Sequence, residues 1–299
     1  MVRVRSVLFP VLALSLMSVA ACSGGDDDKG TDDHTGMHGD DDDDVDAQEV
    51  SIGFDAVVGS DMAMCGMAYT VGGQEIELAD ARLYLSGLEV RVDGEWQLLT
   101  LDDSDWQHEG VALLDFEDGS AGCADSGTSD LNDTLVGSAP AGVIDGLRFD
   151  VGVPFELNHV DSATAPAPLN APGMFWTWQG GYKFVRVDYA VTGAERWNVH
   201  VGSTGCVSDA PVSAPEEECS APNRATIELD VDPTAANVVI DLGALIDGAD
   251  VATNIEKTPP GCMSSPMEAG DCAPVFDNLG LDFASGFCAN DCADQAVFR

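Results

Sequence analysis

The stretch Ile227-Glu-Leu-Asp-Val231 alternates apolar and acidic residues with a period of two. Because successive side chains of a β-strand point to opposite faces, this period predicts a strand with one buried and one solvated face. Similar short apolar or alternating runs recur between clusters of Gly, Pro, Asn and Asp, at 50–57, 81–92, 147–153, 183–191 and 238–242. No stretch keeps a helical period for long. The sequence therefore predicts an all-β, single-domain fold, most simply a β-sandwich.

The N-terminus has the pattern of a bacterial lipoprotein signal. Arg3 and Arg5 precede an apolar run at 7–21, which leads into Val19-Ala-Ala-Cys22, the pattern of a lipobox. The run is about 15 residues long, shorter than the roughly 20 that a membrane-spanning helix needs. We expect residues 1–21 to be a signal peptide and Cys22 to carry a lipid; an uncleaved anchor is the alternative. Such a protein would work in the bacterial cell envelope, on the periplasmic side or at the outer-membrane surface.

Residues 22–49 form an acidic segment that is rich in aspartate and has almost nothing apolar to bury. Like charges repel one another and extend a chain, so we expect a disordered tether between the lipid and a folded β domain at 50–299. The tether also contains three potential metal ligands, which are His34, Met37 and His38. They belong either to a solvated spacer or to a metal-capturing tail.

The chain carries a formal net charge of -41 over 299 residues. This charge repels nucleic acids and anionic lipid headgroups, so we exclude nucleic acid as a partner. It permits divalent cations, which keeps a calcium-stabilised surface adhesion module as the alternative function. Calcium takes about 6–8 oxygen ligands, whereas the aspartates lack regular DxDxDG spacing and concentrate in the flexible tether.

Nine cysteines are present, and eight remain when the lipidated one is set aside. An even number predicts disulfides in an oxidising compartment. Proximity in the sequence favours three pairs and leaves the fourth by elimination. The expected pairs are Cys206–Cys219, Cys262–Cys272, Cys288–Cys292 and Cys65–Cys123. A zinc–thiolate site is the rival interpretation, although none of these pairs has CxxC spacing.

Two histidines and a methionine are candidate metal ligands. His159 follows an apolar strand and precedes a Pro-rich loop. His200 lies in the alternating stretch 197–201, on the face opposite the apolar residues. Met263 lies in the loop that the expected Cys262–Cys272 pair would close. Imidazole and thioether ligands favour Cu(I), but for either histidine alone a solvated or structural role is the simpler interpretation.

Six sequence blocks occur in order along most of the chain. They are Gly110-Val-Ala-Leu-Leu-Asp-Phe-Glu-Asp118, Gly152-Val-Pro-Phe-Glu-Leu-Asn-His159, Pro168-Leu-Asn170, Met174-Phe-Trp-Thr-Trp-Gln-Gly-Gly-Tyr-Lys-Phe184, His200-Val-Gly-Ser-Thr-Gly-Cys206 and Gly261-Cys-Met-Ser264. Together these blocks resemble the MbnP-like family, also called the metallo-mystery pair four-Cys motif family. The resemblance covers most of residues 50–287. The Asp-rich tether and the Cys288–Cys292 pair depart from the family pattern.

The resemblance implies a secreted copper-binding β protein that works with a dihaem MbnH-like enzyme related to the cytochrome c peroxidases. That partner oxidises a tryptophan to kynurenine, whose aromatic amine is a nitrogen donor that the indole lacks. The metal ligands that the family blocks imply are His159, His200 and Met263. The candidates for oxidation are Trp176 and Trp178 on the same side of one strand, with Trp106 and Trp197 also open.

The sequence favours a copper-binding protein over an enzyme. No Ser/His/Asp arrangement, phosphate loop or HExxH motif is evident, and a coordinatively full Cu(I) site leaves no position for a substrate. We expect the copper to serve acquisition or homeostasis outside the cytoplasm. A small copper redox enzyme is a further alternative, and it would require an open coordination position.

Overall fold

The computed structural model describes residues 46–299 except 126, 195 and 211. These residues belong to one compact unit, whose first strand begins at Ala47, slightly before the expected start of the β domain. The predicted signal peptide, the lipidation site Cys22 and nearly all of the predicted tether, including His34, Met37 and His38, lie outside the described residues. None of the helices in the described part has the length and apolar composition that a membrane span requires.

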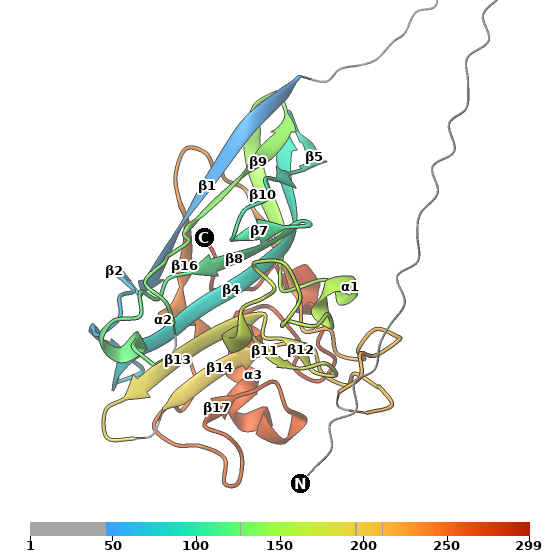
Figure 1. Cartoon of the computed structure of the whole chain (residues 1–299). Coiled ribbons are helices and arrows are strands. Elements are labelled where there is room, and N and C mark those ends of the chain that lie inside the picture. Colours follow the sequence, from blue (N-terminus) through green and yellow to red (C-terminus); the bar gives the residue numbers. More distant parts are fainter. Residues whose placement is uncertain (1–45, 126, 195, 211) are drawn as a thin grey trace, which may run out of the picture. The chain divides into compact units, whose positions relative to one another are not determined.

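Two sheets face each other across a shared core, as the strand pattern predicts (Figure 1). The smaller sheet has the order β16-β1-β9-β6, with β2 paired to β1. Its strands are β1 (Ala47–Val58), β2 (Asp61–Met62), β6 (Thr100–Leu101), β9 (Thr134–Pro140) and β16 (Val238–Asp241). Val50, Ile52 and Phe54 of β1 alternate into the core, where they join Leu83 and Leu85 from the larger sheet. The all-β sandwich is thereby confirmed.

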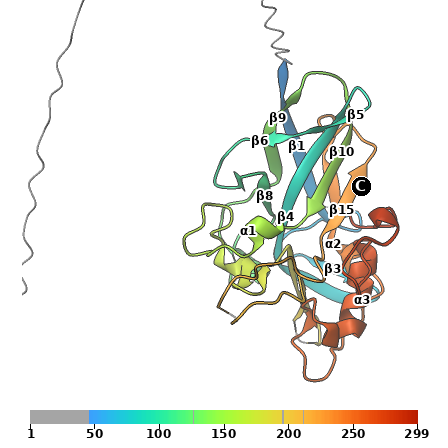
Figure 2. The same cartoon turned by 90° about the vertical axis from the view of Figure 1, so that its right-hand side faces the viewer.

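The larger sheet has the order β15-β10-β4-β13-β14-β17, with β3, β5 and β8 also paired to β4 and β7 paired to β8. The part β15-β10-β4 can be followed in Figure 2, and the part β4-β13-β14-β17 in Figure 1. Its strands are β3 (Ala68–Val71), β4 (Gln74–Val92), β5 (Glu95–Leu98), β7 (Gln107–His108), β8 (Val111–Asp115), β10 (Ile144–Val151), β13 (Val185–Val191), β14 (Trp197–Val201), β15 (Ala225–Leu229) and β17 (Gly261–Cys262). A separate hairpin pairs β11 (Phe175–Thr177) with β12 (Gly181–Tyr182).

The central strand β4 is buried on both faces over most of its length. Ala81 and Leu83 face the main core, whereas Asp80, Arg82 and Tyr84 face the opposite side. The segment 155–184 covers that second face. Two buried tyrosine hydroxyls hold the segment, because Tyr84 donates to the carbonyl of Pro168 at 2.8 Å and Tyr182 donates to that of Leu169. The aromatic segment of the sequence thus packs, in part, as a second hydrophobic cluster.

The helices are short, and most lie in connections between strands. They are α1 (Phe155–Asn158), α2 (Leu242–Leu245), α3 (Ala269–Asn278), η1 (Ala121–Cys123), η2 (Pro172–Met174), η3 (Pro266–Glu268) and η4 (Ala289–Cys292). The sequence pattern did not indicate α3, which contains Pro274 in its interior. Strand ends also differ from expectation. β15 ends at Leu229, so Val231 is exposed, and β16 ends at Asp241, whose carboxylate accepts from backbone N–H groups at the start of α2.

Each cysteine in the described part lies in one of four disulfides, with the expected pairing. They are Cys65–Cys123, Cys206–Cys219, Cys262–Cys272 and Cys288–Cys292. The zinc–thiolate interpretation of these residues is therefore excluded, because a disulfide sulfur carries no thiolate charge.

The disulfides should differ in their contribution to stability. Cys65–Cys123 closes a loop with a sequence separation of 58, and Cys288–Cys292 one with a separation of 4. Since a cross-link limits the unfolded chain more when the loop is longer, replacing the first pair by alanines should lower the free energy of unfolding by about 4 kcal/mol, and the second by about 2 kcal/mol. Chemical denaturation of the two double variants measures both values. Equal losses would contradict the loop-entropy explanation.

Candidate metal centre

His159 lies directly after α1 and is buried, with 6% of its surface exposed. Its Nδ1 lies 2.9 Å from the carbonyl oxygen of Trp178, which can only accept, so Nδ1 carries the proton. Its Nε2 faces the side-chain nitrogen of Asn158 at 3.2 Å and the Sγ of Cys219 at 3.5 Å. Burial lowers the pKa of His159, which favours the neutral ring.

The amide of Asn158 fixes this arrangement. Its oxygen accepts from the N–H of Tyr182 at 2.8 Å, so its nitrogen is the atom that donates to Ser203 Oγ at 2.7 Å and faces His159. Both ring nitrogens of His159 therefore have a protein partner. The Nε2 and the sulfurs of Cys206 and Cys219 all lie within 4.8 Å of one another. Since those sulfurs form a disulfide, this group does not fit a metal ion.

His200 extends from β14 into the second face of the large sheet, opposite the buried Trp197, Val199 and Val201, as alternation predicts. Its Nε2 donates to Asp188 Oδ1 at 2.7 Å, and its side chain is 11% exposed. Burial lowers the pKa of His200, although Asp188 opposes this. Because the carboxylate accepts a hydrogen bond from one imidazole nitrogen, the lone pair of the ring is on the other nitrogen. Histidines that bind metals commonly have such a partner.

The register of β14 and β17 brings Met263 beside His200. Val199 pairs with Cys262 in parallel register, so the next residue of each chain is His200 and Met263 respectively. Because side chains alternate, both follow a core-facing residue and point to the opposite face. The adjoining loop is held there by Ser264, whose hydroxyl donates to the carbonyl of His200 at 3.0 Å.

Trp176 lies on the same face, against Gly202. A Cβ atom added to Gly202 would lie 2.5 Å from the Cζ3 atom of Trp176, so only glycine lets the indole approach the strand this closely. Gly202 follows His200 by two residues and therefore shares its face. Trp176 and Met263 also line one hollow of about 630 Å³. Of the predicted site residues, Trp176 and Met263 line this hollow, whereas its described lining includes none of Trp178, His159 and His200. His200 is linked to the hollow through its register position beside Met263.

A family model described as MbnP matches residues 47–264, which is well over half of the chain. The chain belongs to the MbnP family. A solved structure, MbnP from Methylosinus trichosporium, is 31% identical with a TM-score of 0.73, and the match covers 85% of this chain and 98% of that chain. A search of curated proteins found no match.

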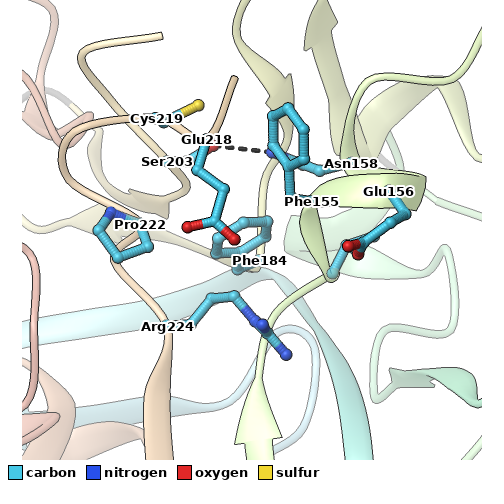
Figure 3. A pocket seen from close by; sticks show the side chains of 10 residues that line it. Phe155, Glu156, Asn158, Phe184, Ser203, Glu218, Cys219, Pro222 and Arg224 are labelled. Atoms are coloured by element: carbon cyan, nitrogen blue, oxygen red, sulfur yellow. Dashed lines mark hydrogen bonds between the residues drawn. The ribbon is translucent and has the colours of Figure 1, made fainter. Parts of the chain in front are cut away.

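In this member of the MbnP family a second hollow, of about 230 Å³, adjoins the first (Figure 3). Ser203 lines both, and the Cys206–Cys219 disulfide joins a residue of one lining to a residue of the other. Figure 3 shows the carboxylates of Glu218 and Glu156 near the rings of Phe155 and Phe184. No pattern in the sequence indicates this hollow, because its walls come from segments that are far apart in the chain.

Sequence reasoning also missed a buried ionic network beside the candidate site. Asp80 pairs with Arg82 at 2.5 Å and with Arg186 at 3.2 Å, and Arg186 pairs in turn with Asp188 at 3.0 Å. Arg186 and Lys183 also donate to the carbonyl of Gly173, at 3.1 and 2.7 Å. These bonds hold the turn that precedes Trp176. Charged residues alternating with apolar ones in 183–191 were the available signal, but they equally suit a solvated strand face.

Gly202→Ala should disturb the indole of Trp176. The new methyl would also lie 2.6 Å from the Tyr182 carbonyl oxygen, so the ring or the strand must shift, at a cost of about 1–3 kcal/mol. Thermal unfolding and tryptophan fluorescence measure the effect. Gly270→Ala is the matched control, because its nearest atom is a side-chain methyl of Ile255 at 3.3 Å. Equal, small effects of both substitutions would contradict the close approach of Trp176.

Asp115 should make stability depend on pH. Burial raises the pKa of this carboxyl to about 7, so between about pH 4 and 7 the folded protein binds more protons than the unfolded chain, and stability falls as pH rises. Asp115→Asn removes this titration. Its stability relative to the natural chain should therefore rise across that window, by up to about 4 kcal/mol, and level off above it.

Denaturant unfolding at a series of pH values measures the effect of Asp115→Asn. The exposed Asp130→Asn variant controls for the loss of one charge. Parallel stability profiles for the natural chain and Asp115→Asn would contradict the raised pKa.

Proposed function

We propose that this protein binds one copper ion at the hollow beside β14, through His200, Met263 and a kynurenine formed from Trp176. The observation that supports the proposal is that Met263 adjoins His200 in the register of β14 and β17 and lines one hollow with Trp176. In this proposal the protein takes part in copper acquisition or homeostasis and is not itself an enzyme. The family membership and the resemblance of the sequence blocks give it further support.

The donor set suits Cu(I). Imidazole and thioether are ligands that soft copper prefers, and the carboxylate of Asp188 orients the imidazole of His200. An indole N–H can only donate a hydrogen bond and offers no lone pair to a metal. Oxidation of the tryptophan to kynurenine supplies an aromatic amine instead. The chemistry of the ligands therefore links copper binding to modification of the tryptophan.

The oxidation is assigned to a dihaem MbnH-like partner that uses peroxide. Two peroxide molecules cleave the indole C2–C3 bond, leave one oxygen atom on each of the two carbons and release two waters. Hydrolysis of the resulting formamide releases formic acid and frees the amine. Trp176 is the best candidate because it lines the hollow, whereas Trp197 is 1% exposed and lies in the core. The contact between Trp178 and His159 uses the backbone carbonyl of Trp178, which accepts from His159 Nδ1.

His159 remains a predicted fourth ligand, and it would have to lose a contact in order to bind. Its Nε2 faces the amide of Asn158, which is held by Tyr182 and Ser203. We therefore assign the primary ligands to the other group. His159→Ala tests the assignment. A loss of copper affinity equal to that of His200→Ala would make His159 a ligand of equal weight.

The location in the cell envelope is part of the proposal. The disulfides agree with an oxidising compartment. The lipid anchor rests on the sequence around Cys22. Membrane fractionation of a Cys22→Ala variant tests it, since loss of the acceptor thiol should move the protein to the soluble fraction.

Production with and without the dihaem partner should give two forms of the protein. With the partner, one tryptophan should lose a carbon atom and gain an oxygen atom, and the copper content should rise. Peptide mapping by mass spectrometry should locate the change at Trp176, so Trp176→Phe abolishes it and the matched Trp178→Phe variant retains it. Equal copper binding by both forms would overturn the dependence on kynurenine, and oxidation of Trp178 would overturn the choice of residue.

Copper affinity should depend on the grouped side chains. Asp188→Asn should weaken binding about 10–100-fold, as loss of an outer partner of a histidine ligand typically does, and His200→Ala should weaken it further. Competition with a Cu(I) chelator under anaerobic conditions measures both. His108→Ala, a half-buried histidine on β7, is the control and should bind copper normally. Unchanged affinity in His200→Ala would exclude His200 as a ligand and overturn the proposed ligand set.

A further inference from the structure

We infer that the 62–67 loop, which runs from the last residue of β2 to the residue before β3, is a second soft-metal site, in which the thioethers of Met62, Met64 and Met67 bind one Cu(I) ion. The inference stands apart from the copper site proposed beside β14, since it uses different residues and does not require an oxidised tryptophan. Three methionines within six residues are exposed, which is an unusual surface feature.

These methionines are exposed although methionine is normally a core residue. Met62, Met64 and Met67 are 53%, 55% and 45% exposed, while Ala63 between the first two is buried. The chain therefore directs its small side chain inward and its large apolar ones outward. Burial cannot explain this pattern, because each exposed thioether forgoes the stabilisation that the core would give it.

The backbone places the three methionines within one short, tightly turned segment. Met62 pairs with Val57 at the end of an antiparallel ladder, so alternation directs Met62 and Met64 to the face opposite Ala63. The chain then reverses in a tight turn, in which the N–H of Met67 donates to the carbonyl of Met64 at 3.2 Å. Gly66 supplies the positive φ, +75°, that the third residue of such a turn requires.

Bonds from Tyr69 and Cys123 hold the loop in this shape, and neither set of bonds uses a thioether sulfur. The hydroxyl of Tyr69 accepts from the N–H of Met64 and donates to the carbonyl of Met62, each at 2.7 Å. Cys65, between the methionines, is bonded to Cys123. A Cβ at Gly66 would lie 2.5 Å from the Cβ of Ala121, so the turn rests directly on η1. A site whose backbone is fixed in advance loses less entropy when it binds.

Thioether chemistry determines the ligand. Sulfur ligands without charge select soft monovalent ions such as Cu(I), and Ag(I) in the laboratory, over calcium, magnesium or zinc. Thioethers do not titrate, so binding needs no proton release. An exposed site of this kind suits exchange of copper with the surroundings, and the less exposed site beside β14 suits retention.

Ag(I), which is redox-inert, is the probe for this site. Titration of the full chain carrying ¹³C-methyl methionine should shift the assigned methyl signals of Met62, Met64 and Met67 together, at one equivalent of bound ion. The triple Met→Leu variant at these positions should bind one equivalent less. Calcium should shift none of the three signals. If the three signals do not shift together in the natural chain, the inference is overturned, whatever the variant shows.

A second variant tests whether the two sites bind metal independently. His200→Ala with Met263→Leu should lose the site beside β14 and retain the methyl shifts of the loop. If these shifts disappear in that variant, the loop has no independent site and the inference fails. If they persist while copper retention is unchanged, the loop inference stands and the proposed function fails.

Discussion

Arg186 is the side chain on which the arrangement of the candidate copper site depends. It lies between Asp80 and Asp188 and reaches the carbonyl of Gly173, so one guanidinium joins the large sheet to the segment that covers it. Removing a buried partner leaves an uncompensated charge, which costs several kcal/mol. Asp188 also accepts a hydrogen bond from the ring N–H of His200. Loss of Arg186 would therefore affect the covering segment, the orientation of the histidine and the position of Trp176 together.

The strands could largely be predicted from the sequence because period-two patterns follow directly from backbone geometry. The runs at 81–92 and 183–191 lie within or largely overlap β4 and β13. The double-sided burial of β4 could not be predicted, since Asp80 and Arg82 read as a solvated face until a covering segment is known. Helix α3 was missed because Pro274 argues against a helix interior and the helix is set by tertiary packing.

The types of residue in the candidate site were foreseeable, but their grouping was not. His159 and His200 look equivalent in sequence, and only the structure gives the first a partner on each ring nitrogen. The neighbourhood of His200 and Met263 comes from a parallel pairing between strands about 60 residues apart, a register that alternation alone does not fix. Trp176 differs from Trp178 through its contact with Gly202, which no spacing rule contains.

The complete pairing of the cysteines in the described part has a consequence for chemistry that uses peroxide. A thiolate is more easily oxidised than an indole and would be converted to a sulfenic acid first. Two disulfides, Cys206–Cys219 and Cys262–Cys272, flank the residues of the candidate site. By removing thiols from this neighbourhood, they leave no thiolate there to compete with the indole of Trp176 for an incoming oxidant.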